Sequence, residues 1–413
     1  MRTNSKNRFN KFNKYIMKIN TIIIYVCIIS MFLFLSTDFF RYIKYLVVIV
    51  SLYVLFYSYL VKWKNIKNIF NKSFPLWFIF LWTLILIMTV LRNPSQFVTI
   101  FKTFCVFSMY IFNIILLYVD DNTKKQFDTK TMIRVVSTII CMWIIVSDFK
   151  LLVSGERIGF SIMTLNPNGA GTVLSILFFA LIYFVKSEKK YVDIILSILV
   201  LFVIFLTGSK HAIIMACVSL FVFIFKDGKL SKKRLLVLFT GIILSIALIF
   251  TIPFLKRNVG DRFLKLLGTM NVIDYENDYS STQRVKYTSR AIELWEKTPI
   301  FGGGYNNVKI NSGYNTYSHN NYIEILCTVG IIGFVVYYGY IVYLLYRLLR
   351  YRIRRKSIYD MRNISVLVLV SILISDIGAV TFTLYPFYYI VYFLIDYKFG
   401  ISFNENNKLL NNK

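Results

Sequence analysis

The sequence predicts an all-α polytopic membrane protein, with about twelve transmembrane helices and one large outer-face loop that contains short amphipathic helices. Of its 413 residues, 57% are hydrophobic and 16% are charged, and the mean hydropathy is +0.61. A soluble domain of this size cannot bury so much apolar surface, so lipid must surround most of the chain. The formal net charge of +28 comes from basic residues in short clusters between apolar runs. Such clusters are typical of cytoplasmic loops, and they argue against nucleic acid as a partner.

Apolar runs long enough to cross a bilayer, about 20 residues each, recur along the whole chain. The predicted spans lie near residues 16–36, 43–61, 74–91, 97–119, 132–153, 169–186, 191–207, 210–226, 234–253, 321–346, 364–382 and 384–397. The first run follows a basic N-terminus, as in a signal peptide, but it is long and has no small-residue cleavage site after it. We therefore expect it to be retained as the first span.

The orientation of the bundle follows from its loops. If the basic N-terminus is cytoplasmic, four further segments rich in Lys or Arg also lie inside, at 61–72, 186–190, 226–234 and 347–356. A count shifted by one span would place all of them outside, against the positive-inside bias. We therefore expect both termini in the cytoplasm.

Three parts of the chain follow from this orientation. Residues 1–254 hold about nine transmembrane helices. Residues 255–320 form the large extracytoplasmic loop, and residues 321–413 form the C-terminal transmembrane helices and a cytoplasmic tail. The short turns at 154–168 and 207–211 fall on the same outer face as the loop.

These two turns contain candidate binding residues. Asn166 and Asn168 bracket Pro167, whose ring disfavours helix in the residue before it. The motif is either a turn with a helix cap or a pair of amides presented to a polar substrate. Lys210 begins a span, where a cation is unfavourable for the helix dipole. It is either a lysine that snorkels to the interface or one that holds a phosphate together with free helix N–H groups.

The large loop contains a predicted amphipathic helix after Ser281. The residues that recur at steps of three and four are Arg284, Tyr287, Thr288, Ala291, Ile292 and Trp295. Arg284 and Arg290 lie on nearly opposite faces, so at most one points at a given site, and the alternative for each is a solvated arginine. Arg257 adds positive charge just after the preceding span. The glycines at 302–304 lack a following Gly-Lys-Ser/Thr, so they indicate a tight turn rather than a phosphate loop.

The segment YSHNNYIE at 317–324 joins the loop to the next span. Asn321 with Glu324 fits a capping arrangement for that helix. His319 lies just outside the helix. It is either a structural histidine or, with an ordinary pKa near 6.5, a general base at neutral pH.

Three of these elements occur in a fixed order. GSK at a span start is followed by R-x14-P-x2-G-x-G from Arg284 to Gly304, and then by SHN-x-Y before a span with Gly-x2-Gly. This order resembles the O-antigen ligase and polymerase superfamily, whose members are polytopic proteins of the bacterial cytoplasmic (inner) membrane that join lipid-carried glycans. The resemblance implies that Arg284 and His319 are the functional pair. It also implies that Lys210 replaces the family's arginine, which keeps the charge but loses bidentate phosphate recognition.

The reaction that the resemblance implies is glycosyl transfer from an undecaprenyl-diphosphate-linked oligosaccharide to a hydroxyl of an acceptor glycan. A diphosphate leaving group needs positive charge where its own charge develops, which Arg284 and Lys210 supply. The acceptor hydroxyl needs a base within hydrogen-bond reach, and His319 is the candidate.

No metal and no cofactor are expected. The acidic cluster of the large loop is interpreted as solvated, and it comprises Asp274, Glu276 and Asp278. The five cysteines lie inside apolar runs without CxxC or Cys/His spacing, so neither a disulfide framework nor a zinc site is indicated. The residues expected to bind substrate are Asn166, Asn168, Arg257, Arg290, Asn320 and Tyr322, and the tyrosines available to stack on sugar rings are Tyr305, Tyr314, Tyr317 and Tyr322.

The residues leave the acceptor open. A composition rich in Ile, Lys, Asn, Tyr and Phe indicates an AT-rich gene, as in many surface-polysaccharide clusters, and favours a capsule or O-antigen polymerase. The first alternative is an O-antigen ligase that moves the glycan to lipid A core. The second is a flippase or transporter of lipid-linked oligosaccharide, which would place an ionisable pair at mid-bilayer, with Lys102 and Asp376 as the candidates. Expected partners are the lipid-linked oligosaccharide, the acceptor glycan and the bilayer, with a chain-length regulator as a further candidate.

Overall fold

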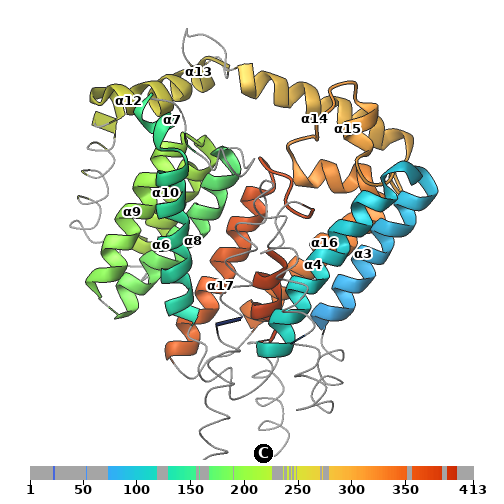
Figure 1. Ribbon diagram of the computed structural model, residues 1–413, viewed down its shortest axis with the longest axis horizontal. Coiled ribbons are helices and arrows are strands. Elements are labelled where there is room, and N and C mark those ends of the chain that lie inside the picture. Colours follow the sequence, from blue (N-terminus) through green and yellow to red (C-terminus); the bar gives the residue numbers. More distant parts are fainter. Residues whose placement is uncertain are drawn as a thin grey trace, which may run out of the picture.

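The computed structural model describes residues 73–118, 129–154, 167–188, 190–225, 251–269, 279–350, 356–383 and 388–397, together with single positions elsewhere. Within these residues the regular secondary structure is helical throughout (Figure 1). The predicted spans near 16–36 and 43–61 lie outside the described residues except at single positions, and half of the residues of the span near 234–253 lie outside them too. The total of about twelve helices therefore stays a prediction.

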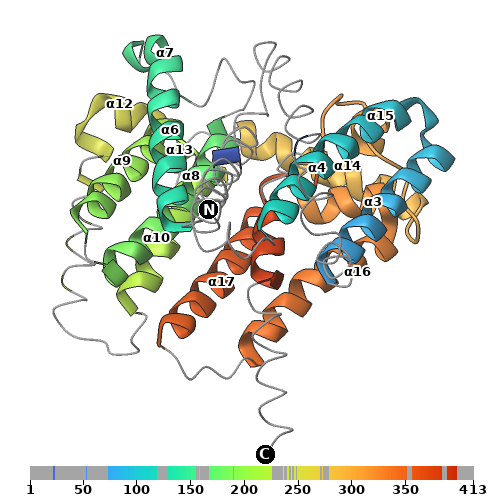
Figure 2. The same cartoon turned by 60° about the horizontal axis from the view of Figure 1, so that its bottom comes forward.

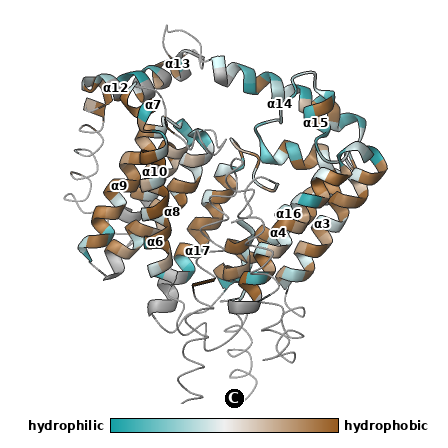
Figure 3. Cartoon of the chain, viewed as in Figure 1, coloured by the Kyte–Doolittle hydropathy of each residue, from teal (hydrophilic) through white to brown (hydrophobic). Residues whose placement is uncertain are grey.

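Long apolar helices form the body of the protein, and Figure 3 shows how their hydrophobic residues dominate it. They are α3 (Ser73–Arg92), α4 (Phe97–Tyr118), α6 (Thr129–Ser147), α8 (Pro167–Glu188), α9 (Tyr191–Thr207), α10 (Lys210–Phe225), α16 (Asn321–Arg350) and α17 (Lys356–Ser375). Among the described residues, five helical segments are by length and composition able to cross a membrane, namely Ser73–Arg92, Pro94–Ile115, Lys130–Ser147, Pro167–Val185 and Asn321–Arg350. The all-helical, multi-pass prediction is thus confirmed for the part of the chain that the structure describes.

The helices form two groups joined by α17 (Figures 1 and 2). One group contains α6, α8, α9 and α10, and the other contains α3, α4 and α16, while α17 packs against both α8 and α16. The second group has an aromatic core, in which Trp77 stacks on Tyr340 with ring centroids 4.2 Å apart. In the first group, the Arg134 guanidinium forms two hydrogen bonds to Asp193, of 2.6 and 2.9 Å, that tie α6 to α9.

Short helices and one amphipathic helix lie across one end of this bundle (Figure 1). They are α7 (Phe149–Val153), α12 (Pro253–Leu255), the π-helical turn η4 (Lys256–Gly260), α13 (Asp261–Thr269), α14 (Tyr279–Lys297) and α15 (Asn307–Asn311), while the 3₁₀ turn η2 (Pro94–Gln96) joins α3 to α4. The helix predicted after Ser281 is confirmed as α14, and Ala291 on its apolar stripe is fully buried. The assignment of this end to the outer face stays a prediction.

A break in α16 fixes α14 to the bundle. Gly330 has φ 66° and ψ −165°, which interrupts the helix after its first nine residues, Asn321–Val329. The break removes the helical partners of two N–H groups and two carbonyls, and the chain after α14 replaces all four. Ile331 N donates to Pro299 O at 2.9 Å and Ile332 N to Ile300 O at 3.3 Å. The carbonyls of residues 327 and 328 accept from the N–H groups of residues 303 and 304, at 2.8 and 3.0 Å.

The glycine loop at 302–304 is therefore part of this crossing. Gly302 and Gly304 have φ of 71° and 84°, as a tight turn requires. A Cβ on Gly302 would lie 2.6 Å from Gly330 N, so the two backbones pass in direct contact. Because the N–H groups of Gly303 and Gly304 already donate to carbonyls of α16, they are not available to a phosphate. The tight-turn interpretation is confirmed.

Candidate active site

The beginning of α10 lies against the beginning of α8. Gly208, with φ 56°, ends α9 in the left-handed conformation, and Ser209 O accepts from Ile213 N to start the next helix. A Cβ on Gly171 would lie 2.7 Å from Ala212 Cβ, so α8 approaches this turn without a side chain between them. The predicted Asn168 and Lys210 segments are thereby brought together.

Both of these predicted residues are half-buried. Asn168 lies in the first turn of α8, where its carbonyl accepts from the Thr172 hydroxyl at 2.9 Å. Lys210 is the first residue of α10. Asn166 lies outside the described residues.

Arg284 of α14 reaches the same region from the opposite side. A Cβ built on Gly378, in the turn after α17, would lie 4.0 Å from Arg284 Nη1 and 3.5 Å from Nδ1 of His211. Arg284 also interacts electrostatically with the His211 ring. Because His211 follows Lys210 directly, the predicted loop arginine lies next to the start of α10.

His319 lies in a left-handed backbone conformation, with φ 58°. The residues beside it are firmly held: Ser318 N donates to Glu324 Oε2 at 2.8 Å, and the Ser318 hydroxyl donates to Asn320 O at 2.8 Å. Thr288 of α14 also donates to the Ser318 carbonyl, at 3.3 Å. These contacts fix the imidazole relative to α14, and hence to Arg284 one turn earlier on that helix.

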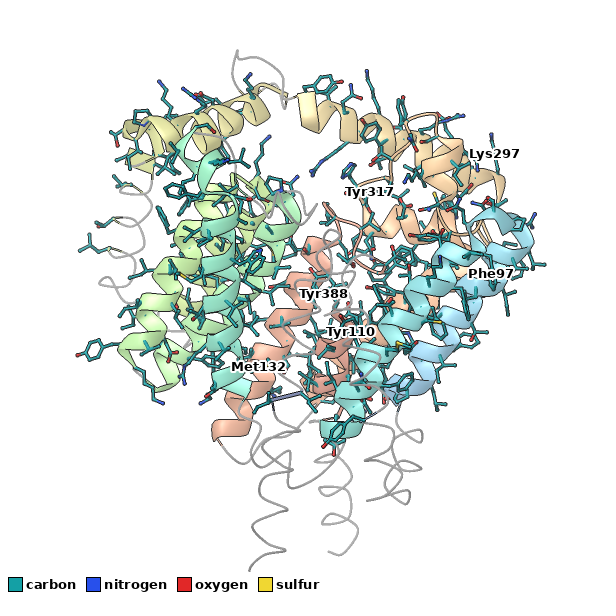
Figure 4. All side chains as sticks on the ribbon, viewed as in Figure 1. Phe97, Tyr110, Met132, Lys297, Tyr317 and Tyr388 are labelled. Atoms are coloured by element: carbon teal, nitrogen blue, oxygen red, sulfur yellow. The ribbon has the colours of Figure 1, made fainter. Side chains whose placement is uncertain are left out.

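Two tyrosines flank the His319 ring. Tyr287 of α14 lies nearly parallel to it, with centroids 5.9 Å apart and an interplanar angle of 24°. Tyr317 contacts it at 4.3 Å, and Figure 4 shows Tyr317 on the inner side of α14. Tyr314 extends the cluster through Tyr287, at 4.9 Å. Such a group of partly exposed aromatic rings beside a base is suited to a sugar.

The His319 imidazole has a lower pKa than a histidine in a solvated loop. Burial and, second to it, the positive charge of Arg284 lower the pKa of His319 from 6.5 to about 4. A neutral imidazole at pH 7 has a lone pair available to accept a proton.

The predicted cap of α16 is wrong by one residue. Asn320, not Asn321, caps the helix, since its Oδ1 accepts from Ile323 N at 3.2 Å. Asn321 is buried, and its Oδ1 accepts from the backbone N–H groups of Thr381 and Phe382 at 2.8 and 3.1 Å. The reason is tertiary: the turn after α17 docks on Asn321 and leaves the cap to its neighbour.

Other predicted binding residues lie in different surroundings. Arg290 pairs with Glu293 on the exposed side of α14. Arg257 is exposed in η4. Tyr322 stacks on Tyr338 at 4.5 Å and donates its hydroxyl to Leu373 O at 2.8 Å, so its visible contacts are with the protein. The structure therefore brings Arg284 near His319 and His211, and it brings the helix starts that carry Lys210 and Asn168 together.

Asp376 does not pair with Lys102, as the transporter alternative would require, because its hydrogen bonds are with other residues. Its carboxylate is fully buried and accepts from Thr381, Tyr338 and Asn321 at 2.6, 2.9 and 3.1 Å. Lys102 lies on the exposed surface of α4. Asp376 thus holds the turn that lines the site.

Sequence reasoning missed two residues of the site. His211 is one of only two histidines in the chain and follows Lys210 directly, which was a usable signal. Tyr287 was assigned to the amphipathic stripe, although it lies one turn from Arg284. Among the described residues no group of three or more His, Cys, Asp or Glu side chains could hold a metal ion. The acidic residues at 274, 276 and 278 are not among those described.

Two comparisons show which known proteins the chain resembles. Residues 195–338, which include Lys210, Arg284 and His319, match the family described as O-Antigen ligase. The chain is also similar to the teichuronic acid biosynthesis protein TuaE of Bacillus subtilis (strain 168), with 26% identity over 232 residues. That similarity covers 52% of this chain and 46% of the relative. Together with the predicted motifs, these matches support the O-antigen ligase and polymerase superfamily as the family that this chain resembles.

Proposed function

We propose that this protein polymerises lipid-linked oligosaccharide repeat units of a capsule or O-antigen on the outer face of the cytoplasmic membrane. It transfers the growing glycan from undecaprenyl diphosphate to a sugar hydroxyl of the acceptor. The observation that supports this most is that α14 brings Arg284 into electrostatic range of the His319 imidazole and of His211, at the start of α10.

The chemistry assigned to each residue follows from its surroundings. His319 accepts the proton of the acceptor hydroxyl as that oxygen attacks the anomeric carbon of the donor sugar. The bond from this carbon to the diphosphate oxygen breaks, and the leaving group departs with the bonding electron pair. Arg284 and Lys210 stabilise the negative charge that develops there, in a site shielded from bulk water. The proton on His319 then passes to solvent.

In the enzyme without substrate, a pKa of about 4 makes His319 a weak base. Binding of the donor raises this pKa. A bound diphosphate brings negative charge next to Arg284 and opposes the effect of the guanidinium on the imidazole. The pKa of His319 therefore rises when donor is bound. Base strength is thus coupled to the presence of the leaving group, which disfavours proton abstraction in the empty site.

The acceptor distinguishes the proposed activity from its alternatives. The similarity to a protein named for teichuronic acid biosynthesis supports a role in polysaccharide biosynthesis. An O-antigen ligase would use the same residues with lipid A core as acceptor, and a transporter would move the lipid-linked unit without joining it to another.

A reconstituted transfer assay tests the proposal. Purified protein in lipid nanodiscs is given a lipid-diphosphate-linked repeat unit, with and without lipid A core, and products are separated by size. We expect longer glycans without the core. Transfer only when the core is present would support the ligase, and no product under either condition would contradict transferase activity.

The matched variant for this assay is His319→Asn. Asparagine tolerates the left-handed backbone that His319 adopts, at φ 58°, but its amide cannot act as a base. We expect this variant to fold and insert normally and to lose at least about a hundredfold in transfer rate. Long polymer made by His319→Asn at a near-normal rate would defeat the general-base assignment.

A further inference from the structure

The second histidine of the chain, His211, lines the site from the first turn of α10. Its Nε2 lies 3.1 Å from the hydroxyl of Ser375, the last residue of α17. Its Nδ1 edge faces Gly378, where an added Cβ would lie 3.5 Å from Nδ1 and 4.0 Å from Arg284 Nη1. The imidazole edge and the guanidinium therefore border the same small volume, over a residue that has no side chain.

The Ser375 hydroxyl links His211 to Tyr388. The Tyr388 hydroxyl donates to Ser375 Oγ at 3.4 Å, and Figure 4 shows Tyr388 deep between the helices. Ser375 Oγ lies 3.1 Å from Nε2 of His211, a contact in which either group can be the donor. In the tautomer in which the serine hydroxyl donates to Nε2, the neutral ring carries its proton on Nδ1. That tautomer presents an N–H donor to the volume that Arg284 also borders.

We propose that His211 binds a phosphate oxygen of the lipid-linked donor through Nδ1–H, together with the Arg284 guanidinium. This inference rests on the proposed function, which supplies a diphosphate as leaving group. Two donors from different helices that converge on one volume suit an oxyanion, and a hydrogen bond from a fixed donor to a charged group is strong. Lys210, the preceding residue, adds positive charge at the same helix start. His211 takes part in holding the leaving group, while His319 handles the proton of the acceptor.

Two amide variants separate this role from a structural one. The amide nitrogen of asparagine can occupy the place of Nδ1, and that of glutamine the place of Nε2. If Nδ1–H contacts phosphate, His211→Asn keeps the donor, whereas His211→Gln keeps only the contact with Ser375. If His211 merely ties α10 to α17, the order of the two variants reverses.

The experiment measures binding of undecaprenyl diphosphate, without sugar, to the purified protein in nanodiscs. We expect wild type and His211→Asn to agree within about threefold, and His211→Gln and His211→Ala to bind about ten- to a hundredfold more weakly. Wild-type affinity in His211→Gln with loss in His211→Asn would overturn the proposal, as would unchanged affinity in all three variants. Thermal unfolding of each variant identifies any that do not fold. If His211→Ala does not fold, the comparison of His211→Asn with His211→Gln still decides between the two roles.

Two further conditions separate this inference from the proposed function. If wild-type protein does not bind undecaprenyl diphosphate, the proposed function fails. If wild type binds undecaprenyl diphosphate and the three variants bind it with the same affinity as wild type, only the role of His211 fails. Inorganic diphosphate in place of the lipid should show the same difference between Asn and Gln, and a difference seen with the lipid alone would overturn the assignment to phosphate.

Discussion

Replacing Gly330 with alanine tests whether the crossing at the break in α16 holds Arg284 and His319 in one site. Gly330 has φ 66° and ψ −165°, a region that costs other residues about 1–3 kcal/mol. Its Cβ would also lie 2.1 Å from Ile300 O, so the crossing segment must move away. Loss of two of the four backbone hydrogen bonds at the crossing adds about 1–3 kcal/mol. Together these give a destabilisation of about 2–6 kcal/mol, concentrated where α14 is anchored.

Two glycines elsewhere in the chain supply matched controls. Gly339 lies in α16 as well, but a Cβ there would meet nothing within 4 Å, and alanine is favoured over glycine in a helix by about 0.5–1 kcal/mol. Gly313 has φ 83° and equally open surroundings, so Gly313→Ala measures backbone strain alone.

The assay combines three measurements on purified variants: the thermal unfolding midpoint, the rate of transfer, and hydrogen exchange at the amides of residues 331 and 332. We expect Gly330→Ala to lower the midpoint, to speed exchange at both amides and to lose most transfer. Gly339→Ala should match wild type, and Gly313→Ala should show only a small loss of stability. If Gly330→Ala behaved like Gly339→Ala in all three measurements, the crossing would not be what positions α14.

Three further predictions concern the chemistry. Because His319 acts as a base in its neutral form, kcat/KM should fall as pH decreases through about 4. The acidic limb of kcat should lie at a higher pH than that of kcat/KM, because bound diphosphate raises the pKa of His319. Arg284→Gln should move the kcat/KM limb upward; a limb that stays fixed, or one near 6.5 in wild type, would contradict the electrostatic link. Lys210→Arg should retain transfer and Lys210→Ala should lose at least about tenfold, whereas equal rates would assign Lys210 to snorkelling at the interface. A chelator should leave transfer intact, and strong inhibition reversed by added metal would refute a metal-independent mechanism.

The sequence was sufficient to predict the local features of this site. Spacing of three and four residues predicted α14, because an amphipathic helix repeats with that period. The basic clusters and apolar runs predicted a multi-pass helical protein. In lipid the backbone N–H and C=O groups must find partners within the segment, and a helix provides them. The order of motifs also pointed to Arg284 and His319 together, although 34 residues separate them in the printed chain.

Features that depend on distant contacts were not predictable. Asn320 and Asn321 are equivalent as candidate caps in the sequence, and only the turn at 381–382, about 60 residues later, decides between them. The predicted span near 321–346 was continuous, since a glycine within an apolar run is compatible with a membrane helix. The break at Gly330 exists because the backbone at 299–304 supplies the missing hydrogen-bond partners. The role of His211 depends similarly on the turn at Gly378.

A double-variant cycle on Arg284 and His319 tests the central claim most directly, which is that these two side chains act on one substrate in a single site. Transfer rates are measured for wild type, Arg284→Gln, His319→Asn and the double variant, with Lys286→Ala as the control for loss of one charge on the exposed side of α14. Groups that act together in one transition state show strongly non-additive effects. We predict that the double variant retains about the rate of the slower single variant, within about threefold. A double variant whose loss equals the product of the two single losses would show that the two residues act independently, and would contradict a shared site.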